Sequence, residues 1–471
     1  MSKAEHHKTK PEDRVPFSRK VGYGCGMTAQ AMMLQPLTQM ASLVFNVCLG
    51  VNPVFIGWVM GGSRLWDAIT DPVMGSVTDK TRSRWGRRRP WIALGGLFCA
   101  LTFPAVWLMP RGMSESFYVS WFVVSVLLFY LAFTMFSVPY IALGMELSPD
   151  YHERTSVVAF RSIIAQAGGL VVASLYWFNS LPMFDDFADG MKVSGIVIGV
   201  AVLVLTLVAA ITSREHPSLL KRQVNKPSVS LMTSVRETIS HKPFLMIIAI
   251  TVLLLIGTLM VNHLGAYISI YYVFGGDKGP AFGKMMTCVL WISKIGTLSS
   301  IPLLTMLSKR VGKRNALLAA ISLALVGTLL KWFCYTPAHP YLQLVPALLV
   351  SSAFAGIWAL VNAMIPDVVD LDELQTGERR EGMFSAVYGW TYKLGVALAL
   401  VVSGYVLNLS GFDVDLPQQT ERSIFLMRLC FTVVPSAAIV LAFVVTWIYP
   451  VSEQRSYEIR QKLEQQREAQ N

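Results

Sequence analysis

Long runs of apolar residues separated by short polar segments dominate the sequence. A helix needs about 20 apolar residues to cross the hydrocarbon layer of a membrane, and each run is at least that long. The runs lie near 24–50, 53–78, 91–110, 117–146, 157–182, 193–212, 244–274, 281–307, 315–335, 340–366, 382–408 and 424–449. Only helices satisfy their backbone polar groups segment by segment in lipid, so this pattern predicts an all-α membrane protein with twelve transmembrane helices.

A polar segment between the sixth and seventh runs divides the chain into two groups of six helices. The turn after the second run, DKTRSRWGRRRP, is similar to the turn after the eighth run, SKRVGKRNALL, because each puts a glycine between basic residues. Two six-helix halves in parallel repeat are typical of the major facilitator fold. The expected order is a cytoplasmic N-terminal tail at 1–20, a first half at 21–212, a cytoplasmic linker at 213–243, a second half at 244–450 and a cytoplasmic C-terminal tail at 451–471, which we expect to be a solvated helix.

Composition and charge agree with a membrane protein. Hydrophobic residues make up 54% of the chain and the mean hydropathy is +0.50, which is too apolar for a soluble domain of this length. The net charge of +11 comes from basic residues concentrated in alternate loops, so it indicates membrane topology and not a nucleic-acid partner. We therefore expect a multi-pass protein of the plasma membrane, the inner membrane in a bacterium, with both termini in the cytoplasm.

The segment RLWDAITDP puts two carboxylates inside the second predicted helix. Asp67 and Asp71 are one helical turn apart, so they project from the same face. Two carboxylates this close repel each other unless one holds a proton or a cation lies between them. Hydroxyls such as those of Thr70 and Thr134 suit Na⁺ or Li⁺, and the same acids can relay a proton. This pattern predicts a site for a coupling Na⁺, Li⁺ or H⁺, with no other metal site.

Two basic residues within the predicted helices, Arg161 and Lys393, are candidate anchors for a substrate, one in each half. A guanidinium and an ammonium can hold hydroxyls, a carboxylate or a phosphate, or can neutralise the acids when no cation is bound. Ion pairing alone is an alternative for these charges, with Arg64 beside Asp67 or Lys393 beside Asp71.

Enzymatic chemistry has no support in the sequence. An intramembrane enzyme needs a nucleophile beside a base, or a metal cluster at helical spacing, and neither pattern is found. The six cysteines lie in or beside the apolar runs without CxxC or Cys/His spacing. We expect a protein that is not an enzyme, uses no cofactor and acts as a monomer on a small molecule in the lipid bilayer.

Four segments together resemble the glycoside-pentoside-hexuronide:cation symporters, whose best-known member is melibiose permease. The similar segments are KVGYGCG, RLWDAITDPVMGSVTDKTRSRWGRRRPW, VPYIALGMELSPDYHERT and PDVVDLDELQTGERREGMFSAVYGWTYKLG, in this order. The resemblance implies the major facilitator fold and import of a sugar or glycoside together with a cation, by alternating access.

The resemblance also implies which residues bind the cation. The family's acid pair on helix 2 matches Asp67 and Asp71, with Thr70 in the place of an asparagine between them and Thr134 as the hydroxyl of helix 4. Because Thr70 differs from the family's asparagine, the identity of the ion stays open among Na⁺, Li⁺ and H⁺.

The sugar site departs further from the family. Its helix 5 arginine and helix 11 lysine match Arg161 and Lys393, but the two aspartates that hold a galactoside are replaced by Ala31, beside Gln30, and by Ser137. The expected substrate-binding residues are therefore Arg161, Lys393, Gln30 and Ser137. No carboxylate is present at these two positions to bind the hydroxyls of a sugar, which favours a substrate other than a galactoside.

Animal sodium-dependent lysophospholipid transporters resemble the same family and also lack these aspartates. A cation-coupled carrier of lysophospholipid or another amphiphile is therefore the alternative to a carrier of a glycoside, hexuronide or related sugar. The methionine-rich stretch at 27–40 can line an apolar cavity or can simply pack between helices.

Finally, the resemblance implies a cytoplasmic gate made of charge pairs in the loops after helices 2 and 10, which break for the transporter to open inward. The expected gating residues are Asp79, Arg87, Arg88, Asp367, Asp370 and Arg380.

Overall fold

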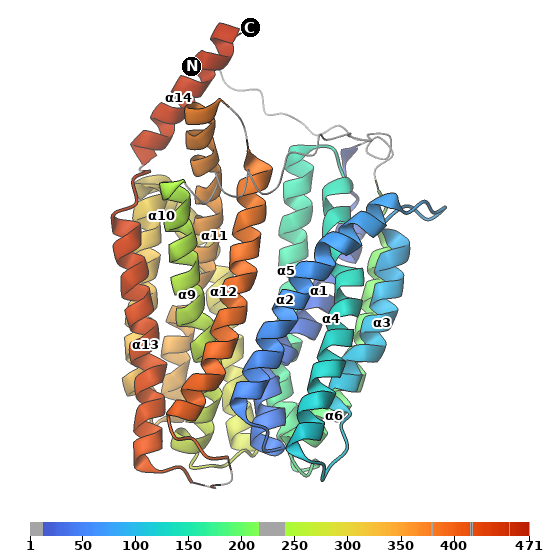
Figure 1. Cartoon of the computed structure of the whole chain (residues 1–471), viewed down its shortest axis with the longest axis vertical. Coiled ribbons are helices and arrows are strands. Elements are labelled where there is room, and N and C mark those ends of the chain that lie inside the picture. Colours follow the sequence, from blue (N-terminus) through green and yellow to red (C-terminus); the bar gives the residue numbers. More distant parts are fainter. Residues whose placement is uncertain are drawn as a thin grey trace. The chain divides into compact units, whose positions relative to one another are not determined.

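The computed structural model describes residues 13–215, 241–377, 380–414, 416, 418–451 and 453–470 (Figure 1). Every regular element within these ranges is a helix, which confirms the predicted all-α fold. The chain forms two compact units. Unit 1 comprises Met1–Val51 and Leu65–Lys226, and unit 2 comprises Asn52–Arg64 and Pro227–Asn471.

The helices of the first half follow the predicted apolar runs closely. They are α1 (Phe17–Ser42), continued by a short π-helix (Leu43–Cys48), α2 (Pro53–Lys80), α3 (Arg89–Trp107), α4 (Glu115–Glu146), α5 (Tyr151–Asn179) and α6 (Phe187–Thr212). Capping side chains begin three of them: Ser114, Asp150 and Asp186 accept hydrogen bonds from backbone N–H groups in the first turns of α4, α5 and α6.

The second half continues with α9 (Lys242–Ile268) and its π-helical end (Ser269–Val273), α10 (Pro280–Cys334), α11 (Leu344–Thr376), α12 (Glu381–Leu409), α13 (Glu421–Trp447) and α14 (Glu453–Gln470). The long α10 is two helices joined at Gly312, whose φ of 81° breaks the helical backbone. Nine helices of the described chain are long and apolar enough to cross a membrane. Counting both arms of α10, and adding the more polar α1 and α2, gives the predicted twelve.

The GYGCG sequence of α1 explains how this helix packs inside unit 1. A Cβ atom on Gly22 would overlap Thr212 of α6, one on Gly24 would lie 2.5 Å from Ile164 of α5, and one on Gly26 would overlap the ring of Tyr140. Gly24 lies on the opposite side of the helix from Gly22 and Gly26, which are one turn apart on a shared face. The three glycines therefore let three neighbouring helices approach α1 closely.

The first turns of α2 belong to unit 2, where they pack against α12. Backbone carbonyls of α12 lie 2.9 Å and 2.8 Å from where Cβ atoms on Gly57 and Gly61 would be. Trp58 Nε1 donates a hydrogen bond to the hydroxyl of Tyr405 at 3.1 Å. The repeat in the sequence does not predict this grouping. The boundaries drawn at 21–212 and 244–450 remain predictions, and residues 216–240 of the predicted linker lie outside the described ranges.

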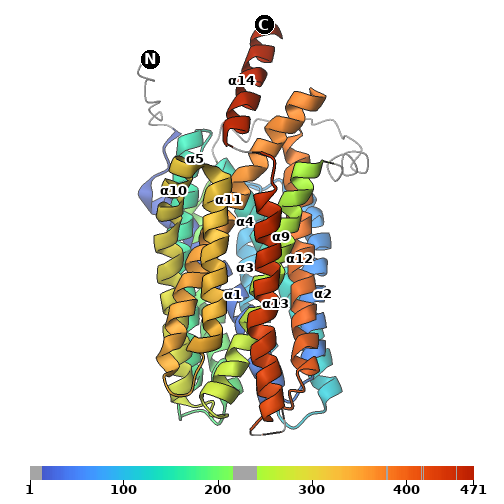
Figure 2. The ribbon, with the colours of Figure 1, turned by 90° about the vertical axis from the view of Figure 1, so that its left-hand side faces the viewer.

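The C-terminal helix α14 extends from one end of unit 2 (Figure 2). It is helical as predicted, but it packs against α11 and is not solvated on all sides. Ile459 and Leu463, one turn apart, are buried with 1% and 6% of their surface exposed. The prediction of a simple solvated tail is therefore wrong for this face, because two apolar side chains at helical spacing suffice to dock it.

Candidate functional site

Three of the predicted cation-binding residues meet between α2 and α4 in unit 1. Thr134 Oγ1 donates a hydrogen bond to Asp67 Oδ1 at 3.0 Å, and the hydroxyl oxygens of Thr70 and Thr134 are 3.1 Å apart. Asp67 and Thr134 are buried, with 8% and 1% of their surface exposed. The structure thus assembles a carboxylate and two hydroxyls, which are oxygen ligands that a small hard cation prefers.

The helix geometry leaves the hydroxyl of Thr70 suited to bind a cation. Thr70 Oγ1 lies 3.1 Å from the carbonyl of Trp66 and 3.4 Å from that of Asp67, so its proton can be donated to the backbone of its own helix. Its lone pairs then remain available on the side where Thr134 lies. A hydroxyl oxygen needs such free lone pairs to act as a ligand of a cation.

The second acid, Asp71, follows Asp67 by one turn of α2 and is half-buried. Lys393 lies on α12 in unit 2, where it is also half-buried, and Arg64 ends the part of α2 that belongs to unit 2. None of these charged side chains lacks an interaction partner. Ion pairing by these residues therefore stays open beside cation coupling.

The predicted substrate anchor of unit 1, Arg161, lies on α5 and contacts α1. Its Nη1 donates to the hydroxyl of Tyr23 at 3.3 Å, and its guanidinium carbon lies 5.9 Å from the centre of that ring. Gln30, two turns after Tyr23 on α1, and Ser137, one turn after Thr134 on α4, are both buried, each 6% exposed. These side chains supply polar groups inside unit 1 without a further acid.

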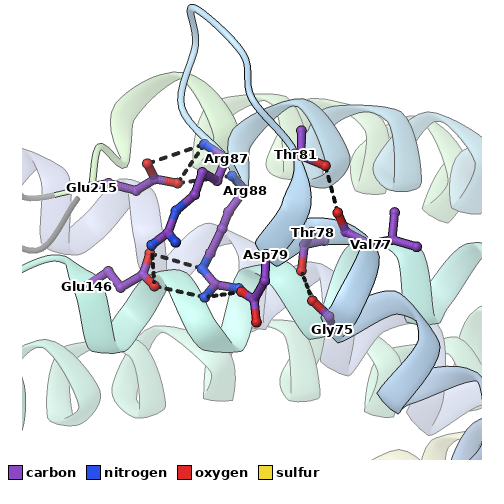
Figure 3. A network of polar contacts seen from close by, with 9 residues as sticks. All are labelled: Gly75, Val77, Thr78, Asp79, Thr81, Arg87, Arg88, Glu146 and Glu215. Atoms are coloured by element: carbon purple, nitrogen blue, oxygen red, sulfur yellow. Dashed lines mark hydrogen bonds and ion pairs between the residues drawn. The ribbon is translucent and has the colours of Figure 1, made fainter. Parts of the chain in front are cut away.

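The predicted gating residues of unit 1 form one ionic network, shown in Figure 3. Arg88 binds the carboxylate of Glu146 through Nε at 2.9 Å and Nη2 at 2.8 Å, and Nη2 also contacts Asp79 at 3.1 Å. Arg87 contacts Glu146 at 3.2 Å. The network joins the end of α2, the turn before α3 and the end of α4.

A second glutamate, Glu215 after α6, fixes the turn itself (Figure 3). Its carboxylate accepts hydrogen bonds from the backbone N–H groups of Arg87 and Arg88, at 2.9 Å and 3.0 Å. Burial lowers the pKa of Arg88, but the hydrogen bond and charge of Glu146, with the charges of Asp79 and Glu215, offset this and raise the pKa overall. Arg88 therefore stays charged at any physiological pH.

Unit 2 holds its gating residues differently. Asp367 of α11 accepts from Lys313 Nζ at 2.6 Å and from Ser456 and Arg460 of α14 at 3.2 Å and 3.3 Å. Arg460 also contacts Asp370 at 3.5 Å. Four of these side chains, Asp367, Lys313, Ser456 and Arg460, line a cavity of about 260 Å³ beside α14.

The predicted Arg380 pairs with neither Asp367 nor Asp370 in the ion pairs described above. Its Nη2 and Nε bind the two carboxylate oxygens of Asp372 at 2.6 Å and 3.0 Å, within a buried part of α11. This is the strong two-bond geometry of an arginine with a carboxylate.

Sequence reasoning named the charges of the loops but missed several of their partners. The missed residues are Glu146, Glu215, Lys313, Asp372 and Arg460. Glu146 and Lys313 lie inside the quoted motifs VPYIALGMELSPD and SKRVGKRNALL, so a search for opposite charges among the motifs would have found them. Arg460 has no such signal in the sequence, because it lies among residues of both charges in a polar helix.

Comparisons with known proteins agree with this architecture. The signature of the MFS/sugar transport protein family matches residues 22–453. The chain is 26% identical to the glucuronide carrier protein homolog of Escherichia coli, covering 95% of this chain and 96% of that protein. It is 22% identical to sodium-dependent lysophosphatidylcholine symporter 1 of Xenopus tropicalis, covering 89% and 84% of the two chains.

The fold is shared with solved transporters of low sequence similarity. The crystal structure of a D-xylose-proton symporter superposes with a TM-score of 0.63 at 16% identity, covering 92% of this chain and 97% of that one. Family and structural neighbours are membrane transporters. The chain therefore belongs to the MFS/sugar transport protein family and is a multi-pass membrane protein of the major facilitator superfamily.

Proposed function

We propose that the protein is a secondary symporter that imports a glycoside, hexuronide or related sugar together with Na⁺, Li⁺ or H⁺ by alternating access. The observation that carries this proposal is the oxygen cluster of Asp67, Thr70 and Thr134, in which Asp67 and Thr134 are buried, with Asp71 one turn away on the same helix face. A carboxylate kept inside a membrane protein next to hydroxyl ligands is typical of an ion path.

Coupling follows from the charges of the proposed site. A cation bound at Asp67 and Asp71 neutralises them and allows Arg161 and Lys393 to turn toward a substrate, with Gln30 and Ser137 supplying further hydrogen bonds. The linkage is reciprocal, since a cation that tightens substrate binding must itself be bound more tightly when substrate is present. The names of relatives, a glucuronide carrier homolog among them, support a sugar or an acidic sugar as cargo.

The proposed gate lies at the basic ends of the two units, meaning the ends that carry the basic turns at 79–90 in unit 1 and 308–318 in unit 2. Asp79, Arg87 and Arg88 in unit 1, and Asp367, Asp370 and Arg380 in unit 2, hold charge pairs that must rearrange when the transporter opens toward the cytoplasm. By the positive-inside rule these ends, and both termini, face the cytoplasm of a bacterial inner membrane.

Uptake by whole cells tests the coupling. Asp71→Asn should abolish concentrative, cation-stimulated uptake while the protein is still made at its normal level. Asp185→Asn, at an exposed position between α5 and α6, is the matched control and should transport normally. Concentrative uptake by Asp71→Asn with unchanged dependence on sodium and pH would exclude the acid pair from the mechanism.

A second candidate cargo, lysophospholipid or another amphiphile, is favoured by the sodium-dependent lysophosphatidylcholine symporter among the relatives. Thermal unfolding of the purified protein with glycosides, hexuronides or lysolipids, each with and without Na⁺, separates the two. A ligand that binds the folded state alone raises the unfolding temperature, so the cargo class should stabilise the protein and more so with its cation.

A further inference from the structure

Two buried tyrosines form a reciprocal clasp between α1 and α4. The hydroxyl of Tyr23 donates to the backbone carbonyl of Tyr140 at 3.2 Å, and the hydroxyl of Tyr140 donates to the backbone carbonyl of Tyr23 at 2.7 Å. Their rings stack with centres 4.6 Å apart and planes 22° apart, and neither side chain is exposed to solvent. Each tyrosine is therefore held at both its ring and its hydroxyl.

Glycines make the space for this clasp. A Cβ atom on Gly26, one turn after Tyr23, would overlap the ring of Tyr140. A Cβ atom on Gly144, one turn after Tyr140, would overlap the hydroxyl of Tyr23. The two motifs that contain these pairs, KVGYGCG and VPYIALGME, thus fit each other sterically, and the position of the Tyr23 hydroxyl is fixed by the fold.

Arg161 of α5 is the third member of this arrangement. A tyrosine hydroxyl has one proton, and Tyr23 directs its proton to the carbonyl of Tyr140, so a lone pair is left for the Nη1 group of Arg161. The Nε group of Arg161 is buried and forms no hydrogen bond. In the described part of the chain no carboxylate pairs with this guanidinium, which leaves its charge available to an acidic ligand.

We propose that Tyr23 is a positioning residue that holds Arg161 in the orientation that receives the acidic group of the substrate, so that the preferred cargo is an acidic sugar such as a hexuronide. A neutral partner suits this task, because a carboxylate partner would cancel the charge that binds the substrate. The inference rests on the proposed role of Arg161 as a substrate anchor. It adds the residue that orients the anchor and the charge of the ligand.

The test measures Arg161 directly and needs no substrate. Purified full-length protein is treated with phenylglyoxal, which modifies arginine guanidinium groups, and the modification of Arg161 is followed by mass spectrometry of its peptide. Tyr23→Phe keeps the ring but removes the hydroxyl that binds Nη1, so Arg161 should react several-fold faster. Gly144→Ala, which displaces that hydroxyl, should have the same effect and serves if Tyr23→Phe cannot be purified.

Tyr140→Phe is the matched control. It removes the shorter hydrogen bond of the clasp but leaves the Tyr23 hydroxyl beside Arg161, so the rate at Arg161 should stay at the wild-type value. A rate that is unchanged in Tyr23→Phe, or that rises equally in both variants, overturns the positioning role. An equal rise would mean that the clasp acts through packing alone.

Uptake of glucuronide, with the uncharged methyl glucoside as comparison, tests whether the preferred substrate is an acidic sugar. Tyr23→Phe should raise the KM for glucuronide several-fold and leave that for the glucoside unchanged. If the labelling contrast is found but Arg161→Lys transports both sugars as wild type does, Tyr23 positions an arginine that is not the anchor. That result rejects the acidic-sugar inference and the anchor role, and leaves cation coupling to its own test.

Discussion

The basic ends of the two units share one backbone turn but differ in the cations that pair with their acidic residues. In each unit a glycine of positive φ, Gly86 or Gly312, lies against the carboxylate of a glutamate that follows the unit's last long helix. A Cβ atom on Gly86 would lie 3.0 Å from Glu215, and one on Gly312 would lie 2.7 Å from Glu453. The repeat in the sequence therefore reflects a shared backbone turn.

A basic residue after each glycine also caps the last helix of its unit. Arg89 Nε donates to the carbonyl of Ala210 at 2.6 Å, at the end of α6. Arg314 donates to the carbonyls of Thr446 and Trp447, at the end of α13. Both satisfy carbonyls that a helix leaves free at its C-terminal end.

The difference lies in where the opposing cations come from. Unit 1 satisfies Glu146 with two arginines of the turn itself, whereas unit 2 satisfies Asp367 with one lysine of the turn and with Arg460 of α14. The ionic network of unit 1 therefore needs no residue from outside its own helices and their turns. Unit 2 depends on the C-terminal helix, and the exposure of its cations, 38% for Lys313 and 50% for Arg460, makes its network the weaker one.

The largest effect is expected when the central acid of unit 1 is neutralised. Glu146→Gln leaves Arg87 and Arg88 without their main partner, and Arg88 has only 10% of its side chain exposed. Removing one partner of such a buried pair costs about 3 kcal/mol of unfolding free energy. Asp367→Asn should cost about half as much, since its half-exposed cations are rehydrated. Denaturation of both variants in detergent checks this order, and an equal cost would contradict the comparison.

The two glycines should respond alike. Gly86→Ala and Gly312→Ala each force a side chain into a left-handed backbone conformation and toward a carboxylate, which costs about 1–2 kcal/mol. Gly389→Ala, in the middle of α12 with open space around it, is the control and should not destabilise the protein. A marked difference between Gly86→Ala and Gly312→Ala in unfolding temperature would show that the turns are not equivalent.

The contribution of α14 should be smaller. Arg460→Gln removes the contacts to Asp367 and Asp370, but because the side chain is half-exposed we expect a loss of at most about 1 kcal/mol. Arg455→Gln, which breaks an exposed pair with Glu458 on the same helix, should have no measurable effect. Hydrogen exchange along α14 distinguishes the two variants, with faster exchange in Arg460→Gln alone.

The smallest effect concerns pH. His241, which precedes α9, has a lowered pKa because of burial; Arg380 adds to this, while Asp372 and a hydrogen bond to Gln375 oppose it. The folded state thus prefers neutral His241, whose contribution to stability is present above the usual value of 6.5 and is lost as the pH falls below it. Replacing His241 by Gln should reduce the decrease of the unfolding temperature between pH 7.5 and pH 5.5. An identical decrease in both proteins would show that His241 does not contribute.

The sequence was sufficient to predict the fold, because the lengths of the apolar runs and the charges of the loops are visible directly in the sequence. Asp67, Thr70 and Thr134, which the sequence predicts as cation ligands, lie together in the structure. Asp67 and Thr70 share one helix, and Thr134 is a hydroxyl within the predicted helix at 117–146. Their role as cation ligands stays a prediction. The sequence could not predict which charges pair across helices. Glu215 and Arg460 are distant in sequence from their partners, and the clasp of Tyr23 and Tyr140 depends on glycines that make room only in three dimensions.

The most direct test of the account is cation binding to the purified protein, because it asks whether the oxygen cluster of α2 and α4 holds an ion at all. Thermal unfolding is measured as a function of Na⁺, Li⁺ and pH for wild type, Asp67→Asn, Thr134→Val and the exposed control Asp185→Asn. One cation should stabilise wild type and the control, should bind Thr134→Val about tenfold more weakly through the loss of one ligand, and should not stabilise Asp67→Asn. Equal stabilisation of Asp67→Asn and wild type by every cation would contradict it.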